Sequence, residues 1–484
     1  MLKMNNRRTT AQKKTEFCPV AKKCGGCQLQ NMSYPEQLSY KQAKVIRLLG
    51  KFCRVGEIIG MENPYNYRNK VQAAFGMTRG GKIISGVYQS GSHRIVSIDE
   101  CRLEDKKADE IIVTIRNMMK HYRMIPYNED TGVGFLRHVL VKRGFTSGEI
   151  MVVLVTGTPM FPGKNAFVKE LLKKHPEITT IIQNINRERT SLVLGNTEKV
   201  LYGKGTIEDT LCGCVFRISA KSFYQINPVQ TEKLYSTAID FAGLTGNERV
   251  IDAYCGIGTI GIIAAKKAKE VIAVEVNKDA VFDAKNNAKR NSTDNIKFYC
   301  DDAGKFMTKM AAEGESADVV LMDPPRAGSD EAFLSSVVTL NPKKVVYISC
   351  NPETQARDLK YLTQHGYKVR KIQPVDMFPH TGHIETVVLL SQRRPDTHID
   401  IKLDLSELDI TSAETKATYQ EIKDYVLDKH GLKVSTLYIS QVKAKCGIIE
   451  RENYNKGKEG HRVPKCPKEK EEAIMDALIH FNMI

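Results

Sequence analysis

The sequence predicts an α/β protein built around a doubly wound parallel sheet, with an α+β domain before it and a small helical appendage after it. Strand-like apolar runs alternate with helical stretches between residues 221 and 395, which is the rhythm of βαβ units. A glycine-rich turn follows the first run, and polar residues follow the later ones. The expected strands are 249–254, 271–276, 296–300, 318–322, 344–349 and 386–391, with helices at 278–291, 329–339 and 353–365.

The glycine-rich turn lies within Asp252–Gly261. Gly256 and Gly258 allow the backbone to approach a ligand closely, because a Cβ atom would block it. The N–H groups that open the following helix are free to meet that ligand. Glu275 ends the second strand about 20 residues later and suits a ribose diol. Dinucleotide and S-adenosylmethionine sites share these features, so the turn alone does not separate them.

Three polar motifs are expected at the carboxyl ends of the strands, where ligands of such sheets bind; two of them follow strands, and the third opens the last strand. They are Asp323-Pro324-Pro325-Arg326, Ser349-Cys350-Asn351-Pro352 and His383-Ile384-Glu385-Thr386. A thiolate that adds to C6 of uracil makes the ring an enolate, and C5 can then attack a methyl sulfonium. A base must afterwards remove the C5 proton so that the thiol can leave. The combination therefore predicts Cys350 as nucleophile and Glu385 as base.

Composition and charge indicate a polyanion partner. The 484 residues suggest about three domains, and the net charge is +16. Residues 1–54 hold 12 Lys and Arg against 2 acidic residues, which fits nucleic acid, although a solvated basic surface is the alternative. No apolar run reaches the length of a membrane span and no secretory signal is present, so we expect a cytoplasmic protein. We also expect it to be a monomer.

A cysteine cluster near the start predicts a metal site. Cys18, Cys24 and Cys27 are closely spaced, and Cys101 is the best candidate for a fourth ligand. In a reducing compartment such cysteines are not expected to form a disulfide framework. Zinc and a [4Fe–4S] cluster both fit four thiolates, and the spacing does not decide between them.

The residues before the main domain read as a helix and then a strand-rich region. Residues 28–54 are mainly helical from Tyr34 onward. Between 55 and 220 short apolar runs and two helices predict an antiparallel α+β sheet. Tyr67-Arg68-Asn69-Lys70 and Arg137-His138 suit phosphates and unstacked bases, or else form an ordinary polar surface. The expected strands are Val71–Phe75, Ile83–Tyr88, Ile150–Val155, Thr180–Asn184 and Ser191–Leu194, and the helices are Lys106–Tyr122 and Gly163–Lys174.

The tail is expected to hold three helices. They cover 413–429, 435–446 and 467–482, an arrangement similar to a helix-turn-helix module or a docking appendage. We therefore divide the chain into a basic tail (1–17), a metal- and RNA-binding domain (18–220), a catalytic domain (221–395) and a helical extension (396–484). The helix at 34–53 is expected to pack on the catalytic domain.

Taken in order, these motifs closely resemble the RNA uracil-C5 methyltransferases of bacterial ribosomal and transfer RNA. The matching stretches also include Ser222-Phe223-Tyr224-Gln225-Ile226-Asn227 and Asp252-Ala253-Tyr254-Cys255-Gly256. The resemblance implies a class I S-adenosylmethionine-dependent methyltransferase fold with a Rossmann-like sheet. It implies that S-adenosylmethionine is held by Gln225, Tyr254, Glu275 and Asp323, with Asp302 facing the adenine. It also implies Cys350 as nucleophile and Glu385 as proton acceptor.

The cysteines refine this resemblance. Cys18, Cys24, Cys27 and Cys101 stand where ribosomal RNA members carry [4Fe–4S] ligands, which favours large-subunit (23S) ribosomal RNA as substrate. Many of those members begin with a small β-barrel RNA-binding domain, whereas only 17 residues precede Cys18 here. Two alternatives remain: a transfer RNA uracil-C5 methyltransferase, and a non-catalytic RNA-binding protein that contains a metal.

Overall fold

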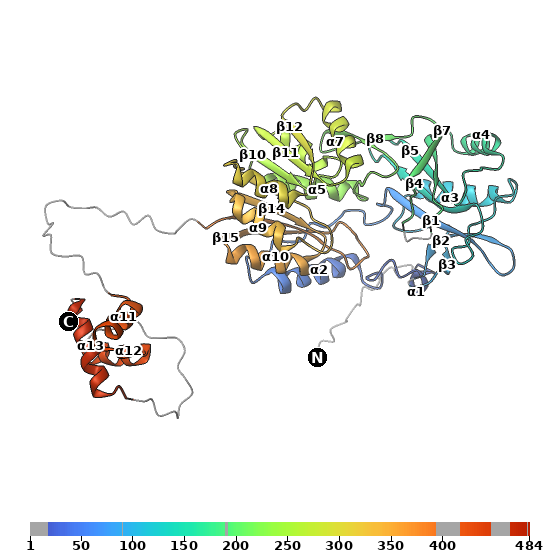
Figure 1. Cartoon of the computed structure of the whole chain (residues 1–484). Helices are drawn as coiled ribbons and strands as arrows, with labels where there is room; N and C mark the ends of the chain where they lie inside the picture. Colours follow the sequence, from blue (N-terminus) through green and yellow to red (C-terminus); the bar gives the residue numbers. More distant parts are fainter. Residues whose placement is uncertain (1–17, 90, 189–191, 394–416, 447–464, 482) are drawn as a thin grey trace, which may run out of the picture. The chain divides into compact units, whose positions relative to one another are not determined.

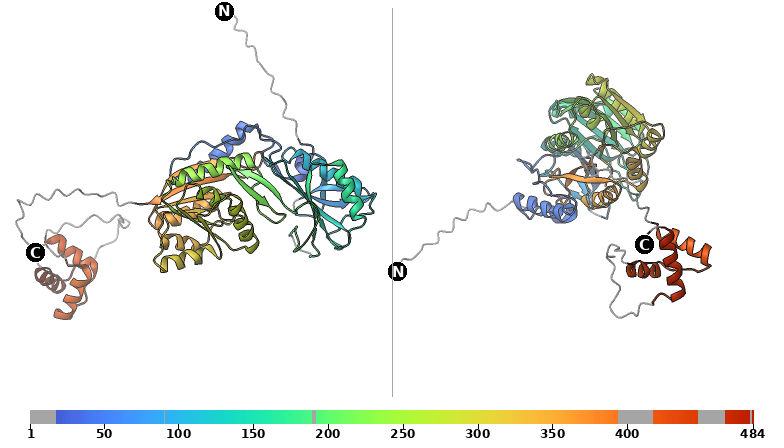
Figure 2. Two further views of the ribbon diagram at one scale, coloured as in Figure 1. Left: turned by 90° about the horizontal axis from the view of Figure 1, so that it is seen from above. Right: turned by 90° about the vertical axis from the view of Figure 1, so that its left-hand side faces the viewer.

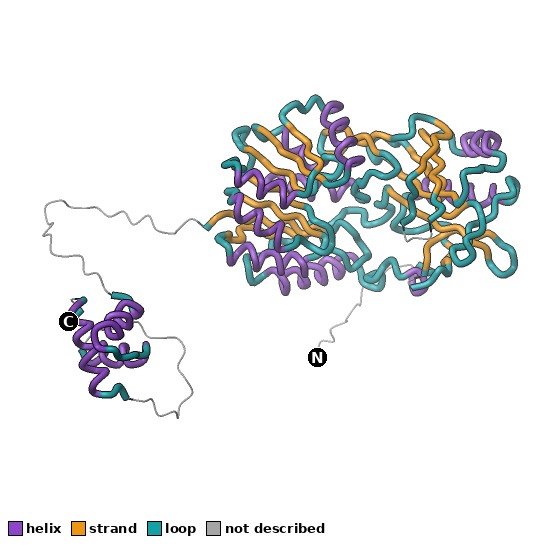
Figure 3. Tube along the Cα trace, in the orientation of Figure 1, coloured by secondary structure: helices purple, strands orange, loops and turns teal. Residues whose placement is uncertain are grey.

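The computed structural model describes residues 18–89, 91–188, 192–393, 417–446, 465–481 and 483–484. The chain divides into two compact units, one ending at Asp396 and one from Thr397 to Ile484. The first unit holds two seven-stranded sheets with helices packed on them and a two-stranded sheet, and the second is helical (Figures 1 and 3).

The catalytic sheet runs in the order β12-β11-β10-β13-β14-β16-β15. Its first five strands are parallel, and β16 and β15 complete it in antiparallel pairing. The predicted doubly wound sheet is thus confirmed. The strand bounds are β10 Arg249–Ala253, β11 Glu270–Glu275, β12 Ile296–Cys300, β13 Val319–Met322, β14 Lys344–Ser349, β15 Tyr367–Val375 and β16 Glu385–Gln392.

Helices cover both faces of this sheet (Figure 2). Successive residues of β10 point to opposite faces, so that Val250 joins the core beneath α5–α7 and Ile251 joins the core beneath α8–α10. Of these helices, α5 and α8 were not predicted, nor was β15. The helix bounds are α5 Pro228–Ala242, α6 Thr259–Ala265, α7 Lys278–Arg290, α8 Ala303–Ala312, α9 Glu331–Leu340 and α10 Pro352–Gln364.

The second sheet runs in the order β3-β2-β1-β4-β5-β6-β7. It is antiparallel as predicted except between β5 and β6, which are parallel because α4 crosses over between them. The expected strand at Ser191–Leu194 is wrong where it is described, since 192–194 are loop and the strand follows at β7. The bounds are β1 Lys70–Met77, β2 Ile83–Tyr88, β3 Ile95–Ser97, β4 Leu136–Arg143, β5 Ile150–Thr156, β6 Ile178–Ile185, β7 Thr197–Tyr202, α3 Lys106–Met119 and α4 Lys164–Lys174.

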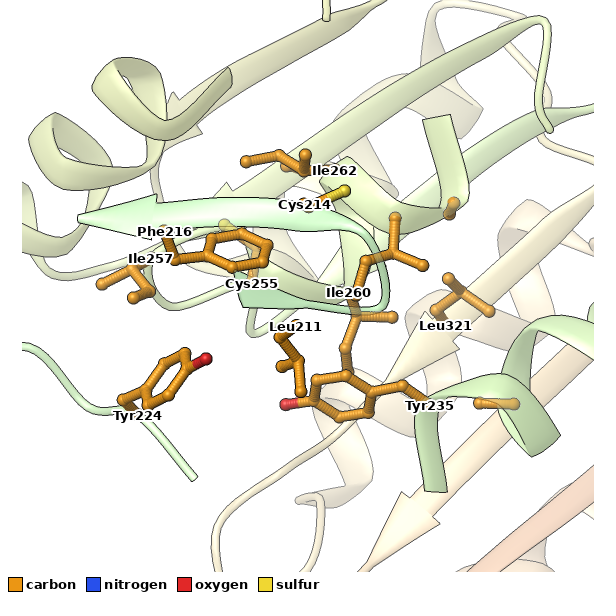
Figure 4. Packing of buried hydrophobic residues seen from close by; sticks show 14 of the residues in the cluster. Leu211, Cys214, Phe216, Tyr224, Tyr235, Cys255, Ile257, Ile260, Ile262 and Leu321 are labelled. Atoms are coloured by element: carbon orange, nitrogen blue, oxygen red, sulfur yellow. The ribbon is translucent and has the colours of Figure 1, made fainter. Parts of the chain in front are cut away.

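Three segments from before residue 221 pack on or extend the catalytic sheet. Helix α2 (Tyr34–Leu49) contributes Val45 and Leu49 to the core beneath α8–α10, and residues 55–59 extend the sheet edge beyond β15. The hairpin β8 (Ile207–Leu211) and β9 (Cys214–Ile218) packs against α6 and the glycine turn, as Figure 4 shows. The contacts thus cross the expected boundary between 220 and 221.

A buried ion pair joins α2 to the loop between β15 and β16. Lys41 Nζ lies 2.6 Å from Asp376 Oδ1, and both side chains are fully buried. Lys41 also donates to the carbonyl of Phe378 at 3.0 Å, and Tyr34 donates its hydroxyl to Asp376 at 2.9 Å. These bonds fix the loop that leads into Glu385.

The C-terminal unit is a small helical bundle. It contains α11 (Tyr419–His430), α12 (Thr436–Lys445) and α13 (Lys468–His480), packed around Ile422, Val426 and Ile474. The first helix begins at Tyr419, later than predicted, because Thr418 caps it in a capping box with Glu421. Residues 413–416 lie outside the described residues. Across the described residues, no helix combines the length and apolar character needed to cross a bilayer.

Replacing Lys41 with Met should lower the free energy of unfolding by about 3 kcal/mol, because Asp376 would be left buried without its cation. Lys44→Met is the matched control on the same helix, since Lys44 lies 3.6 Å from the largely exposed Glu353 and should contribute less than about 1 kcal/mol. Urea denaturation of the full chain measures both. Equal losses from the two substitutions would contradict the role given to the buried pair.

Candidate active site

One cavity of about 550 Å³ gathers residues from the predicted motifs. It opens at the carboxyl ends of β10, β13 and β14, beside the segment 223–226 that precedes α5. Six of the seven residues predicted for catalysis and cofactor binding line it: Gln225, Tyr254, Glu275, Asp323, Cys350 and Glu385.

The glycine turn forms one wall of this cavity. Tyr254 has a φ of +67°, a conformation rarely adopted by non-glycine residues and often found at functional sites. Gly256 has a φ of +54°, and a Cβ atom built on it would meet no atom within 4 Å, so the backbone there is open to a ligand. Glu275 accepts hydrogen bonds from the N–H of Gly256 at 3.0 Å and of Asn277 at 2.9 Å.

The opposite wall holds the candidate chemistry. Burial raises the pKa of Asp323 to about 7. Burial, and then the charge of Asp323, raise the pKa of Glu385 well above its ordinary value. Burial, followed by Glu385 and Asp323, raises the pKa of Cys350 to about 11, while Arg326 lowers it in part. The thiol and both carboxyl groups thus influence one another's ionisation.

This electrostatic pattern suits a cationic ligand. Asp323, Glu385 and Glu275 all line the cavity, and among the described residues that line it Arg326 is the only permanent cation. Carboxyl groups whose pKa is raised by burial are stabilised as carboxylates by a nearby positive charge. A sulfonium therefore fits this donor set.

Asp302 lies outside the cavity lining. It caps α8, where its Oδ1 accepts from the N–H of Lys305 at 2.9 Å. Burial chiefly raises the pKa of Tyr254 to about 12, and the charge of Asp302 contributes. Asp302 is thus close to the site without lining the space itself.

Three aromatic side chains of the cavity had been given no role from the sequence: Phe223, Tyr235 and Phe378. Phe223 is 67% exposed although it lines the cavity, and Phe378 lies on the loop fixed by Lys41. An exposed ring in the cavity that also holds Cys350 offers a stacking surface for a planar base. The one available signal was an aromatic residue two positions before Gln225.

The four cysteines of the candidate metal site lie in two neighbouring segments. Cys27 and Cys101 both pack against Met61, Tyr67 and Leu103. Burial, followed by the charge of Cys24, raises the pKa of Cys27 to about 11, and Cys18 also contributes. Within the part of the chain that the structure describes, no group of three or more His, Cys, Asp or Glu side chains is arranged to hold a metal ion. Cys18 and Cys24 thus lie near Cys27, but the described side chains are not arranged as a metal-coordination site.

The prediction that Arg137 and His138 form an exposed, RNA-contacting surface is wrong. Both residues are buried in β4, with exposed fractions of 2% and 6%. Arg137 donates to both carboxylate oxygens of Glu129, at 3.0 and 2.7 Å, and to two backbone carbonyls. Its guanidinium is therefore used within the fold.

The sheet order, its antiparallel end and the cavity beside the glycine turn define a class I methyltransferase-like fold. A structure of the Pyrococcus abyssi tRNA (uracil-54, C5)-methyltransferase in complex with S-adenosyl-L-homocysteine is similar, with a TM-score of 0.64 and 29% identity. The match covers 75% of this chain and 85% of that one.

Comparison of sequences identifies the family. The tRNA (uracil-5-)-methyltransferase family model matches residues 33–393. An uncharacterized RNA methyltransferase of Clostridium acetobutylicum is 45% identical over 390 residues, covering 79% of this chain and 85% of the relative. One of Halalkalibacterium halodurans is 46% identical over 378 residues, covering 77% and 82%. The chain belongs to the tRNA (uracil-5-)-methyltransferase family.

Proposed function

We propose that this protein transfers a methyl group from S-adenosylmethionine to C5 of a uridine in RNA, through a transient bond between Cys350 and C6 of the base. The observation that carries the proposal is the shared cavity of Cys350, Glu385, Asp323 and the glycine turn. The target uridine must leave its base stack to reach this cavity, which costs a few kcal/mol.

S-adenosylmethionine supplies an electrophilic methyl group on a sulfonium. The residues that would hold it are Gln225, Tyr254, Glu275 and Asp323, with Asp302 near the adenine. Glu275 already orders the glycine turn through Gly256, and its oxygens retain lone pairs for a ribose diol. The carboxylate of Asp323 can accept hydrogen bonds from the N–H groups on the planar edge of a base.

Cys350 and Glu385 have separate tasks in the reaction. The Cys350 thiolate adds to C6, and the ring electrons move to the carbonyl at C4 to give an enolate. After C5 has taken the methyl group, Glu385 removes the C5 proton, the C6–S bond breaks and the thiolate leaves. The charge of Arg326, which lines the same cavity, lowers the pKa of Glu385 against the effect of burial. Arg326 therefore favours the carboxylate in this step, in which the sulfur of the methyl donor has already lost its positive charge.

Glu385→Gln should accumulate a covalent protein–RNA adduct, because the C5 proton can no longer be removed. Cys350→Ala should abolish both the adduct and methyl transfer while S-adenosyl-L-homocysteine still binds. Cys300→Ala is the matched control, since Cys300 is an exposed thiol at the end of β12. Denaturing gels of RNA mixtures and transfer of labelled methyl groups provide the readouts. Turnover by Cys350→Ala would exclude the covalent route.

For the substrate we propose large-subunit (23S) ribosomal RNA, supported by the similarity of the cysteine pattern to ribosomal RNA members. The transfer RNA alternative is favoured by the archaeal neighbour, whose own substrate is uracil 54 of tRNA. The non-catalytic alternative is disfavoured because Cys350 and Glu385 meet in one cavity.

Deleting the gene should remove 5-methyluridine from 23S ribosomal RNA. The amount of 5-methyluridine in transfer RNA should stay unchanged. Nucleoside mass spectrometry of the two separated RNA fractions measures this, with the gene restored on a plasmid as control. Loss from transfer RNA alone would establish the alternative substrate. Loss from neither would favour a non-catalytic protein.

We also propose that Cys18, Cys24, Cys27 and Cys101 bind a [4Fe–4S] cluster. Protein purified without oxygen should be brown and contain about four irons. Cys27→Ala should lose the iron, whereas Cys53→Ala should keep it, because Cys53 packs beside β15 and donates to the carbonyl of Arg370. A colourless protein with stoichiometric zinc would contradict the cluster.

A further inference from the structure

A second cavity, of about 390 Å³, lies next to the active-site cavity. Gln225 and Ile226 line the first cavity, and Asn227, Pro228 and Val229 line the second. Two residues of extended chain span at most about 7 Å. The second cavity therefore begins within about one nucleotide's length of the first.

One loop, at residues 377–379, is bonded to residues of the second cavity and contributes a side chain to the first. Asn227 donates its side-chain N–H to the carbonyl of Met377 at 2.9 Å, and Tyr67 donates its hydroxyl to the carbonyl of Pro379 at 3.0 Å. Both donors line the second cavity, while Phe378, between the two acceptors, lines the first. A molecule in the second cavity would thus contact residues that are bonded to the loop carrying Phe378.

Two aromatic rings of the second cavity are exposed. Tyr65 is 37% exposed, and one face of its ring stacks on His380 with centroids 4.8 Å apart. Phe145 is 60% exposed, and its backbone N–H, which anchors the chain at this point, donates at 3.0 Å to Asp209, which is 1% exposed. Exposed aromatic rings on an anchored backbone are the stacking surfaces that bind unpaired bases.

Polar groups complete the lining. Asn63 and Glu62 are exposed, and their amide and carboxylate can bond to the edge of a base. Lys233 supplies a cation for the backbone and also donates to the carbonyl of Gly60 at 3.2 Å. Amides, a carboxylate and a cation around aromatic rings match a nucleotide better than an apolar peptide.

We propose that this second cavity binds an unpaired base of the substrate RNA that flanks the target uridine. This inference rests on the proposed function, because it takes the RNA in the first cavity as given. Stacking on Tyr65 and Phe145 holds the flanking nucleotide and helps to keep the target uridine out of its own stack. The cavity then contributes to the choice of RNA through the base that it accepts.

Phe145→Ala and Tyr65→Ala should each lower kcat/KM for RNA by about 5- to 150-fold, which corresponds to the loss of one base–aromatic stack. The RNA is the unmethylated fraction from cells that lack the gene. Phe145→Tyr keeps a stacking ring and should stay near wild type. Met160→Ala, at a residue that is 78% exposed outside both cavities, controls for loss of surface apolar area. Affinity for S-adenosyl-L-homocysteine should be unchanged in all variants.

Wild-type kcat/KM in both alanine variants would overturn the proposal. If the wild-type protein methylates no RNA, the proposed function fails, and the second cavity is then judged on binding of a fluorescein-labelled oligouridylate by anisotropy. Weaker binding of that RNA by both alanine variants supports the cavity as an RNA site. Unchanged RNA binding with loss of a co-purifying protein in those variants would assign it to a protein partner instead.

Discussion

The buried pair Lys41–Asp376 is the interaction on which the site depends. A lysine and an aspartate without exposed surface persist only where each supplies the other's charge. Lys41 also reaches the carbonyl of Phe378, and Tyr34 bonds to the same carboxylate. Helix α2 thereby sets the course of the loop that ends at Glu385. That loop carries Phe378 of the active-site cavity and accepts hydrogen bonds from Asn227 and Tyr67 of the second cavity, so one pair orders part of each.

Local patterns predicted much of the catalytic sheet and little of what surrounds it. Strands such as β13 and β14 are buried on both faces and therefore appear as unbroken apolar runs. Strand β15 was missed because Lys368, Arg370 and Lys371 interrupt its apolar residues, as befits a strand outside the parallel core. The site motifs were recognisable because each lies at the end or the start of a strand. The partner of Arg137 was not, because a sequence does not show that Glu129 lies opposite a guanidinium.

The charge of the cavity is opposite to that of the chain. The protein carries a net +16, which attracts a polyanion over its surface. Asp323, Glu385 and Glu275 meet in the cavity, where burial holds the pKa of Asp323 near 7 and raises that of Glu385. A basic exterior with an acidic cavity suits two ligands of opposite charge, an RNA and a sulfonium. Net charge alone would have predicted only the first.

The docking of α2 on β15 has a consequence for how the chain matures during synthesis. The partners of the buried pair are separated by 335 residues. At about 5–20 residues per second, a ribosome needs roughly 15–70 s between the two. During that interval Val45 and Leu49 lack the core that later covers them. Early folding is thus limited to other segments. Until the later core is made, the exposed apolar residues of the nascent helix are a binding site for a chaperone.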